Sequence, residues 1–223
     1  MMEKLNYKGE AKDIVSELHY SIRATKYIIG FTESKLYDFV NDSRANSSVI
    51  IDNRPIIELD KKERMYFFDY MFFDVDTIQQ YNYNLLCVHI YSSLEQFLKK
   101  ICGLLKCNKH SYKKLNKGSS SLEMYTNILK YNYPNLDISE IYNKLDKWRV
   151  IRNSIVHNKN ILTQDKARSV SSIVDIDWTL EPYKISFIIK EHHIVGYLDL
   201  VKEFSILICR TIFKKFDDSI IIL

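Results

Sequence analysis

An arginine, an asparagine and a histidine stand close together in residues 148–158, which read WRVIRNSIVHN. Arg152 carries a permanent, fork-shaped cation that matches the geometry of a phosphate group. His157 carries an imidazole, the side chain best suited to moving protons near neutral pH. Asn153 can position a group or hydrogen-bond a phosphate oxygen. Together these residue types suit phosphodiester chemistry.

Internal transesterification of RNA makes three chemical demands. The ribose 2′-OH must lose a proton, the leaving 5′ oxygen must gain one, and negative charge on the phosphoryl oxygens must be stabilised. His157 could move the protons, and Arg152 could stabilise the charge. We therefore treat Arg152, Asn153 and His157 as the candidate catalytic residues. This chemistry needs no metal ion and no other cofactor.

The helix expected around this segment does not place the two charged groups together. Five residues at about 100° each leave Arg152 and His157 roughly 140° apart on an ideal helix. They can meet if the last turn relaxes or if the long Arg152 side chain reaches round. A second copy of the chain across a two-fold axis would also bring two such pairs into one cleft.

A basic stretch lies between Glu95 and Glu123, where the sequence has no acidic residue. Clustered lysines beside an aromatic residue, Tyr112, favour a phosphate backbone with a stackable base. The alternative is a solvated loop with no partner, because charge runs are common on protein surfaces. The candidate RNA-binding residues here are Lys106, Lys109, Lys113, Lys114 and Lys117.

Other kinds of site find little support. Glu191-His192-His193 resembles a metal site, but adjacent residues in a turn point apart and no third ligand stands nearby, so we expect no metal. The sequence has no G-x-S-x-G and no glycine-rich phosphate loop. The four cysteines lack C-x-x-C spacing, and three lie among apolar residues, which suits reduced, buried thiols.

Most of the chain has helical periodicity. Apolar residues are 46% of the 223 residues, and there are only five Gly and three Pro. Apolar stripes predict helices over residues 13–40 and 76–105. A capping-box pattern at Ser120 starts a third helix that ends near Pro134, and a weaker signal at Asp137 starts a fourth that ends at Asn158 or Asn160. Residues 49–51 could form a strand, and residues 65–73 either helix or core loop.

The period changes near the end of the chain. Alternating apolar residues predict strands over 184–190 and 194–198, joined as a β-hairpin, before a last helix over 198–216. The predicted fold is therefore all-α, an antiparallel helical bundle with a small β-hairpin before its C-terminal helix. We expect one domain over 1–223, with a helical extension over 1–75 and a core over 76–216.

The ends of the chain and its hydropathy bear on location. The start, MMEKLNYKGEAKD, lacks the apolar segment of a secretory signal, and no apolar run approaches the roughly 20 residues that span a bilayer. We therefore expect a cytoplasmic protein with no membrane contact. The net charge of +4 is modest.

Residues 152–157 resemble the signature of the HEPN superfamily, an Arg followed by about four to six residues and a His. Asn153 suits the position after the Arg, and the segment lies in the C-terminal part of an amphipathic helix, as in that family. Residues 91–98, YSSLEQFL, are similar to an upstream family helix. The resemblance covers 76–216 by order of elements. Lys159 replaces the Tyr of the branch that pairs with nucleotidyltransferases, which puts that partnership in doubt.

The resemblance implies a metal-independent endoribonuclease that dimerises through its motif helices. It assigns phosphate stabilisation to Arg152, proton transfer to His157 and positioning to Asn153. HEPN proteins act in toxin–antitoxin, abortive-infection and CRISPR-linked defence, so RNA, a second copy and an antitoxin or defence-system protein are expected partners. The alternative is a non-catalytic module that binds RNA or protein and whose Arg152/His157 pair is vestigial. Independently of the resemblance, Arg152 could be a structural ion-pair residue and His157 a helix C-terminal cap. A purely structural bundle is a third interpretation.

Overall fold

The computed structural model describes residues 2–45, 50–51, 54–55, 61–107, 120–178 and 185–213. It describes side chains in 9–32, 34–36, 38, 77–107, 120–178 and 185–213. Helices dominate, which confirms the predicted all-α class. The helices are α1 (Met2–Ala45), α2 (Lys61–Leu104), α3 (Ser121–Asn132), α4 (Ser139–Asn158), α5 (Gln164–Val170) and α6 (Glu191–Phe213).

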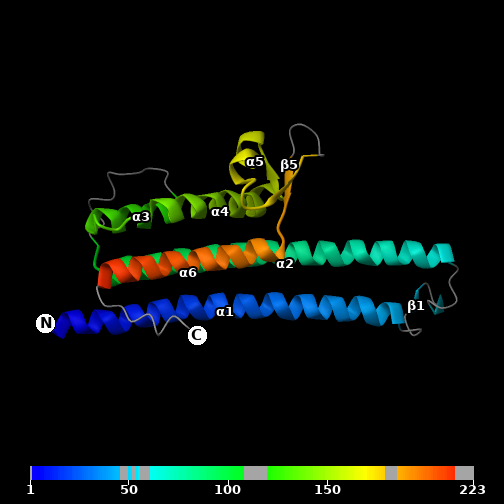
Figure 1. Cartoon of the computed structure of the whole chain (residues 1–223), viewed down its shortest axis with the longest axis horizontal. Coiled ribbons are helices and arrows are strands. Elements are labelled where there is room, and N and C mark those ends of the chain that lie inside the picture. Colours follow the sequence, from blue (N-terminus) through cyan, green and yellow to red (C-terminus); the bar gives the residue numbers. More distant parts are fainter. Residues whose placement is uncertain are drawn as a thin grey trace.

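The long helices form a layered bundle (Figure 1). Helix α2 runs antiparallel to α1, and α6 lies between the α1 layer and the layer formed by α3 and α4. A short two-stranded ladder, β1 (Ile50–Ile51) with β2 (Arg54–Pro55), stands between α1 and α2 in sequence. The predicted boundary at residue 75 falls inside α2, which continues unbroken from Lys61.

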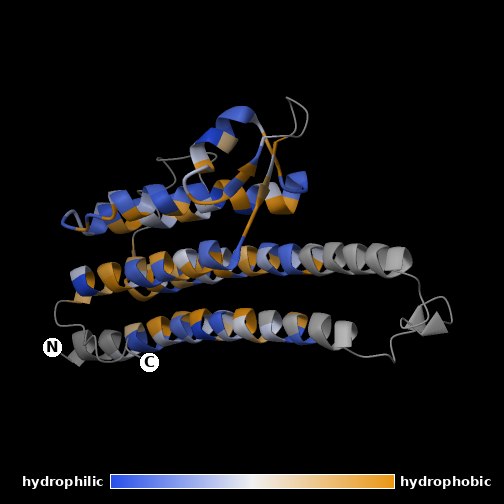
Figure 2. Cartoon of the chain, turned by 45° about the vertical axis from the view of Figure 1, so that its right-hand side comes forward, coloured by the Kyte–Doolittle hydropathy of each residue, from blue (hydrophilic) through white to orange (hydrophobic). Residues whose placement is uncertain are grey.

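One apolar core joins these helices, and orange faces of neighbouring helices meet in Figure 2. The stripe predicted for α2 is buried there, with Leu94, Leu98 and Ile101 fully enclosed. Trp148 of α4 stacks on Tyr197 of α6, with ring centroids 4.2 Å apart and planes 7° apart. Such large, flat contacts fix the distance between two helices.

Local signals set several helix ends. The Ser120 hydroxyl accepts a hydrogen bond from the Glu123 amide at 3.2 Å, as the capping-box pattern predicted. Asp137 accepts from the Ser139 amide at the start of α4. Helix α4 ends where Lys159 and Asn160 take the left-handed conformation, with φ of 50° and 64°. The predicted end at Asn158 is therefore confirmed.

The predicted pairing of strands before the last helix is wrong. Strand β5 (Ile185–Ile188) exists, but residues 194–198 belong to α6. Ile194, Leu198 and Val201 are fully buried at helical spacing, so the period of 3.6 outweighs the local alternation. The partners of β5 come from upstream: β3 (Ile161–Leu162) and β4 (Asp175–Asp177) flank it in an antiparallel sheet of order β3-β5-β4.

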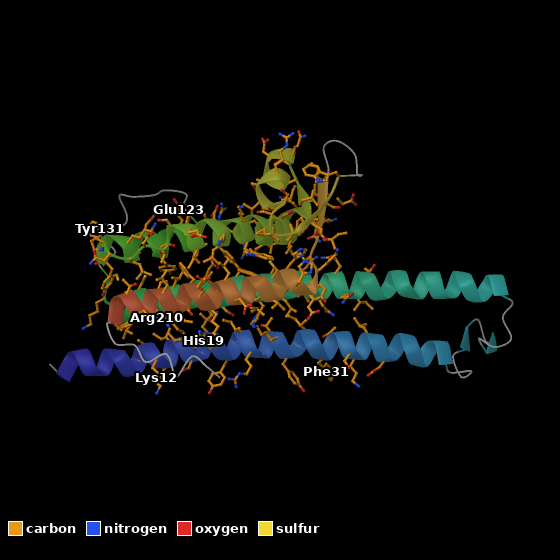
Figure 3. All side chains as sticks on the ribbon, in the orientation of Figure 1. Lys12, His19, Phe31, Glu123, Tyr131 and Arg210 are labelled. Carbon is orange, nitrogen blue, oxygen red and sulfur yellow. The ribbon has the colours of Figure 1, made fainter. Side chains whose placement is uncertain are left out.

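Helix α1 docks along both α2 and α6 through polar contacts around its apolar stripe. Lys26 pairs with Asp199 of α6 at 2.9 Å, and Glu17 pairs with Lys100 of α2. In Figure 3, His19 points from α1 toward α6, while Lys12 and Phe31 point away from the bundle. Among the described residues, no helix combines the length and apolar character that crossing a bilayer requires.

The contact of His19 with α6 predicts a pH dependence of stability. Its Nε2 lies 3.2 Å from the Ser205 hydroxyl, which itself donates to the Lys202 carbonyl. Burial, and secondly the nearby Lys202 charge, lower the pKa of His19 to about 4 from an ordinary value near 6.5. The neutral imidazole is thus favoured in the fold. The contribution of the neutral imidazole to the free energy of unfolding is complete above pH 6.5 and is lost as the pH falls toward 4.

Between pH 7 and pH 4, we expect the free energy of unfolding measured with urea to fall by about 1–2 kcal/mol in the wild type, a modest loss because His19 is partly exposed and its charge is screened. This loss should be absent in His19→Gln. Glutamine can still donate to Ser205 but cannot become charged. Above pH 6.5, the free energy of unfolding should change with pH in the same way in the wild type and the variant. Equal losses in the two proteins at low pH would show that His19 does not titrate within the fold.

Candidate functional site

Helix α4 presents the candidate catalytic segment at its C-terminal end. Its inner face packs into the core through Trp148 and Ile151, which fixes the rotation of the helix. The buried Ser154 hydroxyl donates to the Ile161 carbonyl at 2.7 Å and so ties the end of α4 to β3. The backbone that carries Arg152, Asn153 and His157 is therefore held from both sides.

Arg152 points into the bundle, toward α2. Its guanidinium carbon lies 5.5 Å from the centroid of the Tyr91 ring, a cation–π distance. One Nη1 donor bonds the Asn153 side-chain oxygen at 3.0 Å. The Nε atom is buried with no hydrogen-bond partner among the described residues. Arg152 is thus fixed by a ring and an amide, and Asn153 serves as its positioning partner.

Tyr91 lies at the centre of a group of charges between α2 and α4. Burial raises the pKa of its hydroxyl, and Glu95 raises it further, while Arg149 and Arg152 oppose the shift. The phenol is therefore neutral at physiological pH. A neutral ring keeps the negative π face that attracts the Arg152 cation.

The Glu95 carboxylate of α2 lies near the arginines of α4 but forms no ion pair with them in the described part of the chain. Arg149 pairs instead with Asp146 on its own helix, through Nε to Oδ1 at 2.6 Å and Nη2 to Oδ2 at 3.2 Å. Within the described part of the chain, neither Arg149 nor Arg152 bonds Glu95. Glu95 acts on the site through its charge near Tyr91.

Tyr197 is a residue of this region that sequence reasoning missed. It is fully buried, and its hydroxyl has no hydrogen-bond partner among the described residues, like Arg152 Nε. Burial raises the pKa of Tyr197 well above its ordinary value, and the Arg152 charge acts in the opposite direction. In the sequence, Tyr197 stands at helical spacing from Ile194 and Val201, and that pattern predicts only that it is a core residue.

His157 lies on the exposed last turn of α4, between the exposed Val156 and Asn158. Its imidazole forms no hydrogen bond or ion pair with any other described residue. Arg152 faces the bundle and His157 faces solvent, as the separation of roughly 140° on a helix requires. A single chain therefore does not bring the two groups together, and the last turn does not relax to do so.

Lys106, the first of the lysines predicted to bind RNA, lies far from the C-terminal end of α4. Lys106 is exposed just beyond α2, at a left-handed turn with φ of 47°. From Tyr91, which contacts Arg152, to Leu104 the helix runs roughly 20 Å toward the opposite end of α4 (Figure 1). The other four, Lys109, Lys113, Lys114 and Lys117, lie outside the described residues.

A polar groove between α1 and α2 also escaped the sequence analysis. It has a volume of about 240 Å³. The Ser21 hydroxyl lies 3.0 Å from both His89 Nε2 and the Ser93 hydroxyl along its wall. In the sequence, the sign of this groove is the polar residues that interrupt the apolar stripes of two long helices. That sign is weak evidence for a binding site, because such residues often form hydrogen bonds between helices.

His193, in the first turn of α6, has a structural role. His193 Nδ1 accepts from the Lys190 amide at 3.0 Å, and its Nε2 lies 3.7 Å from Asp175 on β4. These contacts fasten the start of α6 to the sheet. The described residues contain no group of three or more metal-ligating side chains.

Comparison with protein-family models, with curated proteins and with solved structures finds no match for this chain. The likeness to HEPN proteins therefore depends on the residues of segments 91–98 and 152–157 and on the order of elements over 76–216.

The contact between Arg152 and Tyr91 should be measurable as a coupling energy. In a double-mutant cycle of Arg152→Met with Tyr91→Leu, we expect a coupling of about 0.5–2 kcal/mol in the free energy of unfolding, because each single variant removes the same cation–π contact. Tyr91→Phe is the matched control, since it keeps the ring and should keep the coupling. Strictly additive variants would show that Arg152 gains nothing from the ring.

Proposed function

We propose that the protein is a metal-independent endoribonuclease of the HEPN type, which cleaves single-stranded RNA by attack of the ribose 2′-OH. One observation carries the proposal: a single helix end presents an arginine fixed by Tyr91 and Asn153 together with an exposed histidine that has no described partner. A fixed cation suits phosphate binding, and an accessible imidazole suits proton transfer.

Arg152 retains donors for a phosphate. A guanidinium has five N–H groups, and of these one Nη1 group bonds Asn153 while the Nε group is buried. The remaining Nη groups are the ones that would stabilise the phosphoryl oxygens. His157 would remove the 2′-OH proton or protonate the leaving oxygen, and Asn153 would keep the guanidinium in place.

The opposite directions of Arg152 and His157 favour a cleft shared by two chains. In an isologous contact across a two-fold axis, each α4 end faces the other copy. Arg152 of one chain could then face the imidazole of the second chain. We therefore propose a homodimer through α4, with the partly apolar, exposed turn at Val156 in the contact.

The biological setting follows from the same resemblance and is part of the proposal. We propose a cytoplasmic role in prokaryotic defence or in a toxin–antitoxin pair, with an antitoxin or defence-system protein as partner. Lys106 would hold the RNA strand at a distance from the cleavage site, since it lies just beyond the C-terminal end of α2, and the lysine-rich sequence that follows it, to 117, would bind the same strand. An RNA strand of several nucleotides would be needed to reach both regions.

A second candidate function has a specific observation in its favour. Arg152 points into the bundle and its Nε is buried, so its main contribution could be to hold α4 against α2. The protein would then be a non-catalytic module that binds RNA or a partner protein. The two functions differ in whether the chain turns over RNA.

Replacing His157 with alanine should strongly slow RNA cleavage. We expect wild type to cut labelled single-stranded RNA in EDTA, leaving 2′,3′-cyclic phosphate ends, and His157→Ala to be slower by about 10²–10⁴-fold, because a general acid–base group is lost. His89→Ala is the matched control, since His89 is also exposed but lies on α2 beside α1. It should cut at the wild-type rate.

The same assay separates the two functions. If wild type, His157→Ala and His89→Ala all bind a broad panel of RNAs and none cuts, the module replaces the ribonuclease. Cleavage that persists unchanged in His157→Ala would also remove His157 from the mechanism.

Mixing two inactive variants tests the shared cleft. If Arg152 of one chain works with the imidazole of the other, a mixture of Arg152→Gln and His157→Ala forms heterodimers with one intact site, and activity should return. Each variant alone should stay inactive at the same total concentration. No recovery, with heterodimers shown to form by native mass spectrometry, would contradict this arrangement.

A further inference from the structure

Two cysteines meet at the C-terminal end of α2. The Lys106 amide donates to the Gly103 carbonyl and the Cys107 amide to the Cys102 carbonyl, both at 3.1 Å, while Lys106 has a positive φ of 47°. This pair of bonds around a left-handed residue is a Schellman motif, which turns the chain back on the last helical turn. The motif places the side chain after the turn, Cys107, against that of Cys102.

The geometry suits a covalent bond between the two. Because the Cys107 nitrogen lies 3.1 Å from the Cys102 oxygen, bond lengths keep the two α-carbons within about 7 Å, the limit for a disulfide. The Cys102 thiol is also near enough to act on the pKa of the Cys107 thiol. Cys102 Sγ lies 3.8 Å from the Tyr125 carbonyl, which holds it on the side of α3. All four cysteines of the chain are thiols in this structure.

Access and acidity distinguish this pair from the other cysteines. Cys107 is 8% exposed and Cys102 4%, whereas Cys87 and Cys209 are completely buried. The neighbouring Cys102 thiol lowers the pKa of Cys107, although partial burial opposes it. Burial raises the pKa of Cys209 to about 12 and that of Cys87 higher still. The thiolate, which is the reactive form, is therefore most available at Cys107.

We propose that Cys102 and Cys107 form a reversible intramolecular disulfide when the protein meets a peroxide. The Cys107 thiolate attacks one peroxide oxygen, the O–O bond breaks, and Cys107 becomes a sulfenic acid as hydroxide leaves. The Cys102 sulfur then attacks the Cys107 sulfur, and the sulfenic oxygen leaves as water with the Cys102 proton. In total, two thiols and one hydrogen peroxide give one disulfide and two waters. A dithiol reductant reverses the reaction.

The bond would add to a turn that is already closed by two backbone hydrogen bonds, so the helices need not move to form it. It would fix the point where the chain leaves α2. This inference is independent of the proposed ribonuclease activity, because it depends only on the described contacts at the end of α2.

Peptide mapping of the full chain tests the proposal directly. The native protein is treated with hydrogen peroxide, remaining thiols are blocked by alkylation, and the denatured protein is digested with trypsin. Trypsin cleaves after Lys100, Lys106 and Lys109, so a disulfide leaves peptides 101–106 and 107–109 joined. We expect this joined species, about 2 Da lighter than the two reduced peptides together. The thiol count should fall from four to two.

Two serine variants define the order of events. Cys107→Ser should leave Cys102 unoxidised at the same peroxide dose. Cys102→Ser should stop at the Cys107 sulfenic acid, which dimedone captures. Matching circular dichroism spectra confirm that both variants fold. Oxidation of Cys87 or Cys209 at an equal rate, a disulfide between chains, or no joined peptide when free glutathione is fully oxidised would each overturn the proposal.

Discussion

The burial of several faces of α2 is the constraint on which the rest of the structure depends. This 44-residue helix packs against α1, α3, α4 and α6, and Leu94, Leu98 and Ile101 are fully enclosed among them. A helix that is apolar on more than one face gains stability only when neighbours cover each face. Its position therefore determines where α4 can lie, and with it which way Arg152 points.

A half-buried cation at the seam between α2 and α4 is the second consequence of that packing. An unpaired charge is costly away from water, and Arg152 offsets the cost with the Tyr91 ring and the Asn153 amide. The same helix leaves His157 in solvent, where no described contact restrains it. Any joint action of the two residues on one phosphate then needs surfaces from outside a single chain, so assembly and chemistry are linked in the proposed enzyme.

Much of the fold could be predicted because its signals are local. The stripes of α1 and α2, the Ser120 cap and the end of α4 each depend on residues within a few turns of one another. The error at residues 194–198 has the opposite cause: alternation suggested a strand, but the burial of Ile194, Tyr197 and Leu198 against other helices selected α6. The partners of β5 are β3 and β4. Strands that pair across separate segments need no residues at a fixed spacing in the sequence, so no local pattern predicts which strands pair.

The sequence by itself determined the helical class, the start of α3, the end of α4, and the position of Arg152, Asn153 and His157 at the end of one helix. These features follow from periodicity and capping, which are properties of neighbouring residues. Only the tertiary structure decided that Arg152 lies over Tyr91, that Glu95 pairs with neither arginine, and that Cys107 folds back on Cys102. Directions and contacts of this kind depend on how helices rotate to bury their apolar faces, and that is settled by the whole core at once.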